Sequence, residues 1–366
     1  MERPTSPGDV VKARLSALLD RAVAQRVPLN GTIAMTHRCH LRCVHCYLGC
    51  ERQGPPADGE LDTAFWLSLV DQVAQAGCLE LLITGGEPLL RPDFALVYER
   101  ARRRGILASV FTNATLVDER IVRLFEELPP QLVEVTLYGA SERVYERVTG
   151  VRGSYRRCLG AVDTLLDRGV AVALKAVILS DNKEEVPAIR RMAEERGVAF
   201  RVDAALFPCR DGDRHPLDHR VDAAEAVALE MEDESLLRRT AEYFQQMRGL
   251  PPETQLFSCM AGLTGFHVDP QGTLLPCLMV STHGFDLRRG SFREGWDEVL
   301  PCFREQALAP GYECHACERR FLCGLCPAQA GMETGSPHRK ADYACRLGEA
   351  RLDVVKSRLD KSHDAP

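Results

Sequence analysis

The chain has 366 residues, of which 45% are hydrophobic and 27% charged, a composition typical of a globular protein with two domains or one barrel with an appendage. Its 46 Lys and Arg are outnumbered by 52 Asp and Glu, and the net charge of −6 argues against a surface that recruits nucleic acid or an anionic membrane. No signal-peptide pattern is present, and no apolar run approaches the roughly 18 residues of a membrane-spanning helix, so we expect a cytoplasmic protein.

The first part of the chain predicts repeated helix–strand units. A helix is expected within residues 1–27, and the apolar strand GTIAMT (31–36) follows it. From there an amphipathic stretch, a glycine and an apolar run recur, which is typical of a helix that ends at a left-handed glycine and leads into a buried strand. About six such units over 28–220 favour parallel strands with right-handed crossovers, and therefore an α/β fold, a partial (β/α)6 TIM-like barrel. The junction glycines are Gly77, Gly105, Gly169 and Gly197.

Polar segments follow the predicted strands at the point where each strand ends. In ligand-binding folds of parallel strands the site lies at these carboxyl ends. The sequence therefore predicts a functional site at this edge of the barrel. The segments are THRC, TGGEP, TNAT, TLYGAS and LSDN.

The pattern changes after residue 220. Residues 221–250 predict one linking helix that ends at Gly249 and Pro251-Pro252. Residues 251–350 combine short strands, turns and many cysteines, which is typical of a region stabilised by metal, so we expect a domain boundary near residue 250. Residues 351–366 predict a short helix and a tail.

The chain contains fifteen cysteines, and structural disulfides are rare in the reducing compartment expected for it. Clustered cysteines there indicate metal binding or catalysis, whereas isolated ones are usually small buried side chains. Four cysteines stand alone and are expected in the core: Cys78, Cys158, Cys209 and Cys302.

One cysteine cluster follows the first predicted strand. Cys39, Cys43 and Cys46 have the spacing C-x3-C-x2-C, which differs from the spacing in two-cluster ferredoxins and from the paired ligands of structural zinc. At the mouth of a parallel barrel this spacing resembles the radical S-adenosylmethionine (SAM) superfamily. The resemblance implies that the three thiolates bind a [4Fe–4S] cluster whose fourth iron takes SAM, which is cleaved to a 5′-deoxyadenosyl radical. It also implies that Tyr47 lies beside the adenine of SAM.

A second motif, Gly85-Gly86-Glu87-Pro88, ends the second predicted strand and resembles the GGEP segment of that superfamily. Two glycines let the backbone approach a ligand closely, and the Glu87 carboxylate is suited to the ammonium group of SAM. An ordinary strand-to-loop turn is the alternative interpretation of this segment.

The resemblance also implies weaker candidate contacts with SAM. Asn113 and Thr136 end strands where relatives contact ribose or carboxylate, and Arg147 is a candidate partner of that carboxylate. Each has a capping or surface role as its alternative. Lys175 lies within an apolar strand, so it is expected to be buried, paired or directed at the barrel mouth.

The cysteines after residue 250 resemble the SPASM extension of radical SAM enzymes, which carries two auxiliary iron–sulfur clusters. Two departures from the usual pattern are present. Two residues precede Cys326 where three are usual. No fourth cysteine is evident for the inner of the two clusters, so one iron of that cluster either stays open or takes another ligand, for which Cys50 and Cys302 are the candidates. A zinc knuckle is the alternative for C-x2-C-x5-C-x2-C. The resemblance assigns Cys314, Cys317, Cys323 and Cys345 to the outer cluster, and Cys259, Cys277 and Cys326 to the inner one.

The implied substrates are mostly peptides. Relatives that oxidise sulfatases carry an Asp after the second extension cysteine, but Leu278-Met279 follow Cys277 here, which argues against that reaction. Only 38 residues precede Cys39, too few for an N-terminal leader-recognition domain, so we expect a separate recognition protein or strand addition at the barrel edge.

The resemblance thus implies an enzyme that crosslinks or oxidises a ribosomally made precursor peptide. Flavodoxin or ferredoxin is the expected electron donor. A tetrapyrrole side-chain enzyme and a zinc-stapled non-enzymatic binding protein remain the alternatives.

Overall fold

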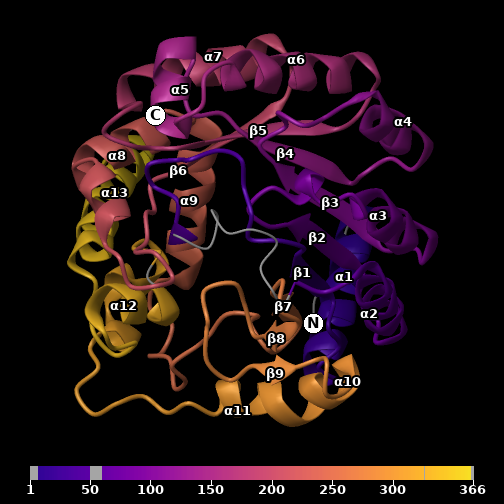
Figure 1. The fold of residues 1–366 in the computed structure, drawn as a ribbon. Helices are drawn as coiled ribbons and strands as arrows, with labels where there is room; N and C mark the ends of the chain where they lie inside the picture. The colour runs from indigo at the N-terminus through magenta and orange to yellow at the C-terminus, as the bar shows by residue number, and fades with distance from the viewer. Residues whose placement is uncertain (1–6, 50–59, 325, 364–366) are drawn as a thin grey trace.

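The computed structural model describes residues 7–49, 60–324 and 326–363. Six consecutive strands pair in parallel, each with the next in the chain, as the repeated helix–strand pattern predicts (Figure 1). The prediction of an α/β fold with a partial six-stranded barrel is therefore confirmed. The strands are β1 (Asn30–Ala34), β2 (Glu80–Thr84), β3 (Leu107–Thr112), β4 (Leu132–Thr136), β5 (Val172–Val177) and β6 (Ala199–Asp203).

Helices between these strands cover one face of the sheet and bury their apolar sides against it (Figure 1). Asp62, Asp118 and Ser141 begin three of them, each accepting a backbone N–H of the first turn with its side chain, which stabilises a helix start by about 1 kcal/mol. The covering helices are α2 (Thr63–Gln75), α3 (Phe94–Arg103), α4 (Glu119–Glu127), α5 (Glu142–Thr149), α6 (Ser154–Asp167) and α7 (Val186–Glu195).

The junction glycines have the backbone conformation that the sequence predicts. Their φ angles are +99° at Gly77, +81° at Gly105, +73° at Gly169 and +63° at Gly197. A residue with a Cβ atom is strained in this region, so each glycine allows its helix to end and the chain to turn into the next strand.

The sheet does not end at the predicted domain boundary. Strand β7 (Gly265–Val268) pairs in parallel with β1, and β8 (Thr273–Leu275) and β9 (Phe285–Asp286) continue the sheet in antiparallel order. Phe266 of β7 packs against Phe292, with ring centroids 4.9 Å apart. The cysteine-rich region is thus joined to the barrel edge to edge, and the division into domains near residue 250 stays a prediction.

The linking helix predicted over 221–250 is two helices. α8 (Ala223–Glu230) and α9 (Glu234–Met247) are separated because Asp233 accepts the N–H groups of Ser235 and Leu236 and so begins a new helix. The last helix, α13 (Asp342–His363), begins earlier than residue 351 and packs against α8, where the Arg351 guanidinium pairs with Glu230 at 2.9 Å.

The remaining elements are short, apart from the first helix. No helix within residues 7–49, 60–324 and 326–363 has the length and apolar character to cross a membrane. These elements are α1 (Pro7–Ala24), α10 (Phe292–Glu294), α11 (Leu300–Arg304), α12 (Pro327–Thr334), the π-helix η5 (Gly295–Val299), and the 3-10 helices η2 (Pro88–Leu90), η3 (Lys183–Glu185), η4 (His215–His219), η6 (Cys314–Ala316) and η7 (Glu318–Phe321).

The isolated cysteines separate into two groups. Cys78, Cys158 and Cys209 are buried, as expected. Cys302 is exposed, contrary to the prediction, because its short helix α11 turns Leu300 and Phe303 into the core and leaves Cys302 at the surface.

Candidate active site

A cavity of about 250 Å³ lies at the carboxyl ends of the barrel strands. The cysteine loop after β1 forms one wall, and residues at the ends of the other strands form the opposite wall. The structure therefore brings together the segments that the sequence placed at one edge of the barrel. The predicted site residues that line the cavity are Cys39, Cys43, Cys46, Tyr47, Gly85, Gly86, Asn113, Thr136 and Lys175.

The three cysteines of this loop share one neighbourhood. The loop is held against α5, because the N–H of Arg42 donates to Thr149 O at 2.8 Å and that of Val44 to Val148 O at 3.0 Å. Burial raises the pKa of Tyr138, and all three thiols add to the increase, so each lies close to that phenol. Burial also raises the pKa of Cys39 to about 12, which favours its neutral thiol as long as no positive charge is nearby.

The two glycines of the second motif are required by contact with the cysteine loop. Gly85 has a φ of +156°, and a Cβ atom there would lie 2.3 Å from Thr36 O. A Cβ atom on Gly86 would lie 2.3 Å from His37 O, and the Gly86 N–H donates to Thr36 O at 2.7 Å. Because only glycine fits, the loop after β2 can lie directly against the start of the cysteine loop.

Glu87 is fully buried and does not line the cavity. Its carboxylate accepts hydrogen bonds from Thr112 Oγ1 at 2.8 Å, Leu89 N at 3.1 Å and Asn113 N at 2.8 Å. Burial raises its pKa to about 7, against the effect of these three donors. These bonds join the carboxylate to η2 and to the end of β3, and the contact with an ammonium group that the sequence predicts for Glu87 stays a prediction. Pro88 is buried as the first residue of η2.

Asn113 is a polar residue in contact with the cysteines. Its Nδ2 atom donates to Cys39 Sγ at 3.8 Å, and its Oδ1 atom accepts the N–H of Thr115 at 3.0 Å. Arg147, by contrast, does not line the cavity, because its half-exposed guanidinium pairs with Asp181 and donates to the carbonyl of that residue. The contact of Arg147 with a carboxylate of SAM stays a prediction, and in this structure Asp181 is the partner of the guanidinium.

Lys175 and Asp203 form an ion pair at the far wall of the cavity. The Lys175 Nζ atom lies 3.3 Å from Asp203 Oδ2, and the two side chains are 20% and 30% exposed. The sequence predicts Lys175 as buried, paired or directed at the barrel mouth, and it is both paired and directed at the cavity. Asp203 was missed, although the segment AFRVD carries the signal, a carboxylate at the end of a strand.

The cysteines after residue 250 form two groups. A second cavity, of about 340 Å³, is lined by Cys314, Cys317, Cys323 and Cys345, and the last three add to the effect of burial in raising the pKa of Cys314. In the other group, burial raises the pKa of Cys277 to about 11, with smaller increases from Cys326 and Cys259. Of the two further candidates for the inner cluster, Cys50 lies outside the described residues and Cys302 is exposed.

Comparison with known proteins decides the family. Residues 33–193 match the family model described as Radical SAM superfamily. The AdoMet-dependent heme synthase of Methanosarcina barkeri is 29% identical over 332 residues, which is 84% of this chain and 94% of that protein. The PqqA peptide cyclase of Gluconobacter oxydans is 30% identical over 343 residues, which is 87% of this chain and 91% of that protein. The chain belongs to the radical SAM superfamily.

A solved structure agrees with this assignment at the level of the fold. Streptococcus suis SuiB bound to the precursor peptide SuiA superposes with a TM-score of 0.69 at 17% identity, covering 95% of this radical SAM chain and 83% of that chain. The shared fold includes the part of the chain after residue 250, because the match extends well beyond the barrel.

Membership of the radical SAM superfamily implies a [4Fe–4S] cluster and SAM, and the cavity fits this pair. Three thiols, the ligands that iron–sulfur clusters take, converge from one loop, and among the described residues lining the cavity no fourth cysteine joins them. The remaining wall includes Asn113, Thr136 and Tyr47, which are residue types suited to a ligand with polar and aromatic parts. The thiols after residue 250 fit auxiliary clusters in the same way.

Proposed function

We propose that this radical SAM protein modifies a ribosomally made peptide by crosslinking or oxidising it. The observation that carries the proposal is the cavity of three thiols and strand-end polar groups, in a chain that aligns over 87% of its length with a PqqA peptide cyclase. The common fold with SuiB, which was solved with a precursor peptide, gives further support.

In this proposal each part of the cavity has its own task. Cys39, Cys43 and Cys46 hold the [4Fe–4S] cluster, which together with SAM supplies a 5′-deoxyadenosyl radical for hydrogen abstraction. Tyr47, Gly85, Gly86, Asn113 and Thr136 line the space for SAM, and Glu87 fixes Asn113 from behind. Lys175 and Asp203 close the far wall, where they orient the substrate or SAM and exclude water.

The cysteines of the C-terminal part are proposed to hold two auxiliary clusters. The outer cluster takes the four thiols that share the 340 Å³ cavity. The inner cluster takes the three-thiol group and keeps one position for the substrate or another ligand. In each group burial and the neighbouring thiols raise the pKa of one member, Cys314 or Cys277. An effect of one thiol on another means that they lie close together, and this closeness supports the division into an outer and an inner cluster. The division of the chain into a barrel of 28–220 and an auxiliary-cluster domain of 251–350 belongs to the same proposal.

Two protein partners complete the proposal. A flavodoxin or ferredoxin donates the electron, and a separate small protein, or strand addition, recognises the leader of the peptide. β6 is suited to strand addition because it is an outer strand of the sheet and its peptide groups face no further strand among the described residues. Free thiols for three clusters require reducing conditions, which favours the cytoplasm as the location.

A tetrapyrrole side-chain enzyme is the second candidate. The observation in its favour is the similarity to the heme synthase of M. barkeri, at 29% identity over 84% of this chain. Both candidates use the same barrel cavity and the same three cysteines, so they differ only in which substrate delivers its hydrogen.

The first experiment tests the radical chemistry. The oxygen-free, iron-reconstituted protein is incubated with SAM and dithionite, and 5′-deoxyadenosine is quantified. The variant C39A/C43A/C46A should form none, yet keep the iron and sulfide of the auxiliary clusters. Deoxyadenosine from this triple variant would refute the assignment of the three cysteines.

The second experiment identifies the substrate class. A short peptide encoded beside the gene is co-expressed and analysed by mass spectrometry, and the peptide is expected to lose two hydrogens. With a deuterated peptide, deuterium should appear in 5′-deoxyadenosine. Transfer of deuterium from a labelled tetrapyrrole, with none from the peptide, would replace the proposal with the second candidate.

A further inference from the structure

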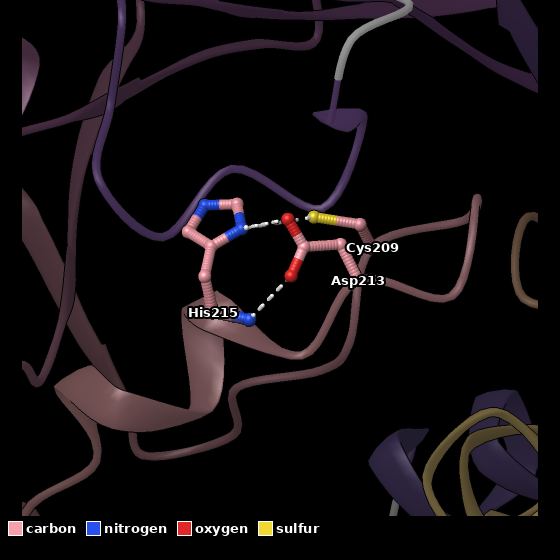
Figure 2. A group of neighbouring side chains, drawn as sticks. All are labelled: Cys209, Asp213 and His215. Atoms are coloured by element: carbon pink, nitrogen blue, oxygen red, sulfur yellow. Dashed lines mark hydrogen bonds and ion pairs between the residues drawn. The ribbon is translucent and has the colours of Figure 1, made fainter.

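A group of three chemically distinct side chains lies outside the cavities described above. Cys209, Asp213 and His215 follow β6 with the spacing C-x3-D-x-H. Their ligand atoms all lie within 4.8 Å of one another, and Figure 2 shows the three side chains turned toward a common point. Cys209 is buried, His215 is partly buried and Asp213 is exposed, so the group reaches from the protein interior to solvent.

The two separations from His215 Nδ1 are close to those around a tetrahedral metal ion. His215 Nδ1 lies 3.7 Å from Cys209 Sγ and 3.0 Å from Asp213 Oδ2. A tetrahedral zinc ion with bonds of about 2.3 Å to sulfur and about 2.0–2.1 Å to nitrogen or oxygen separates its ligands by roughly 3.3–3.6 Å. The two separations from His215 Nδ1 therefore differ from those around a shared ion by only a few tenths of an ångström, and the third, between Cys209 Sγ and the Asp213 carboxylate, is at most 4.8 Å.

The arrangement does not fit a nucleophilic cysteine. In a catalytic Cys–His–Asp relay the thiol and the carboxylate contact opposite nitrogens of the imidazole. Here the Cys209 thiol and the Asp213 carboxylate both approach Nδ1 of His215. A single N–H at that position can donate a hydrogen bond to only one of the two groups, whereas one metal ion can be bound by all three side chains at once.

We propose that Cys209, Asp213 and His215 bind one divalent ion of the zinc type, with a fourth position open to water. The thiolate, the carboxylate and the neutral imidazole together carry two negative charges, which balance a divalent cation at this partly buried position. The mixture of sulfur, nitrogen and oxygen suits zinc better than calcium or magnesium, which prefer oxygen ligands only.

The site is attached to the loop that carries the barrel cysteines. The Arg210 N–H donates to Tyr47 O at 2.8 Å, and Cys209 Sγ donates to Cys46 O at 3.4 Å. A Cβ atom on Gly49 would lie 2.7 Å from Asp211 Oδ2, so the turn and the loop are in direct contact. Metal binding releases the Cys209 thiol proton and its hydrogen bond to Cys46 O, while the Arg210–Tyr47 bond remains. The ion therefore fixes the 209–215 turn as a rigid support beneath the cysteine loop.

The test uses the fully reconstituted protein, so that the iron–sulfur cysteines are already occupied. After incubation with one equivalent of zinc sulfate and desalting, metal analysis should find about one zinc per chain, and zinc-edge X-ray absorption should find one sulfur at about 2.3 Å with nitrogen or oxygen neighbours. C209S and H215Q should each lower the bound zinc at least tenfold. D213N, which changes an exposed side chain, should weaken zinc binding without affecting the fold.

The matched control is C302S, which removes an exposed cysteine outside the group and should keep the zinc. Zinc content that is unchanged in C209S and H215Q, or a zinc ion with three or four sulfur neighbours, would overturn the proposal, because the metal would then occupy cluster cysteines. Hydrogen exchange of residues 40–49 should slow on adding zinc to the cluster-loaded protein. Unchanged exchange despite bound zinc would refute the supporting role of the site.

Discussion

The backbone N–H of Asn113 donates a 2.8 Å hydrogen bond to the buried carboxylate of Glu87, and the side-chain amide of Asn113 reaches Cys39 Sγ. Glu87 thus affects the cavity through Asn113 rather than by facing it. The same carboxylate accepts the Thr112 hydroxyl, so it ties the end of β3 to the loop after β2. This relationship explains why a buried carboxylate follows two glycines that touch the cysteine loop.

Replacing Glu87 with Ala should weaken SAM binding about tenfold and lower stability. The change leaves one buried donor, the Thr112 hydroxyl, and two part-buried backbone N–H groups without their acceptor, and an unsatisfied buried donor costs about 1–3 kcal/mol in stability. SAM affinity is measured by equilibrium dialysis on reconstituted protein, and stability by anaerobic denaturation.

E99A is the matched control, since Glu99 is a helix-surface carboxylate paired with Arg103. It should change neither quantity by a measurable amount. Unchanged SAM affinity in E87A, with its clusters intact, would show that the position of Asn113 does not depend on Glu87.

Much of the barrel was predictable because its signals are local. A glycine after an amphipathic stretch marks a helix end wherever it occurs, so Gly77 and Gly197 indicated units of the fold without tertiary information. The break between α8 and α9 was also locally encoded, in the capping residue Asp233, and was overlooked. The pairing of β7 with β1 could not be predicted, because the segment GFHV carries no information about its neighbour in the sheet.

The site was predictable where several cysteines are close in sequence. Cys39, Cys43 and Cys46 needed no structure to be recognised as a group. Cys209 stands apart from the other cysteines in the sequence, so its burial was expected but its closeness to Asp213 and His215 was not. For Arg147 the sequence could not show the partner that the fold provides. Its position in the sequence fits a contact with SAM, but Asp181, a residue of a distant loop, pairs with it outside the cavity.

The Lys175–Asp203 pair should matter to the cavity. K175M leaves the Asp203 carboxylate without its 3.3 Å partner in the cavity wall, and 5′-deoxyadenosine formation should fall about tenfold. K175M/D203N should recover part of the loss, giving a coupling of about 1 kcal/mol in a double-mutant cycle.

K183M is the matched control, because Lys183 forms a similar pair with Glu225 at 2.7 Å but does not line the cavity. K183M should form 5′-deoxyadenosine at the same rate as the unmodified protein. If K175M and K183M have the same rate, the pair in the cavity wall has no part in the reaction.

The grouping of the C-terminal cysteines predicts which variants share a defect. C277A and C326A should each remove about four irons per chain, and C277A/C326A should remove no more, because both thiols belong to one group. C314A should remove a different signal from the electron paramagnetic resonance spectrum of the reduced protein than C326A does. In C314A/C326A the losses of iron should add.

C302A is the control for this set, as its cysteine is exposed and outside both groups. It should keep all the iron. Loss of the same spectroscopic signal in C326A and C314A would show that Cys326 belongs to the outer cluster, despite its position beside Cys277.

His267 predicts a loss of stability in acid. This histidine of β7 is fully buried, and burial, followed by the nearby Arg210 and His37, lowers its pKa to about 3. The unfolded chain binds a proton at His267 below about pH 6.5, whereas the folded chain does not until about pH 3. The contribution of His267 to stability is therefore complete above pH 6.5 and is lost as the pH falls, by about 1.4 kcal/mol per unit.

H267N should remove this slope. Between pH 7 and pH 5 the free energy of unfolding of the unmodified protein should fall by about 2 kcal/mol more than that of H267N, measured by anaerobic guanidinium titration. The variant is less stable at neutral pH, because the smaller side chain leaves space in the sheet, so the slope and not the absolute value is compared. H283N replaces an exposed histidine whose φ of +59° Asn tolerates, and it should keep the slope. Equal slopes in H267N and H283N would mean that His267 takes up its proton without unfolding, which requires water or an anion to reach it through the seam between β1 and β7.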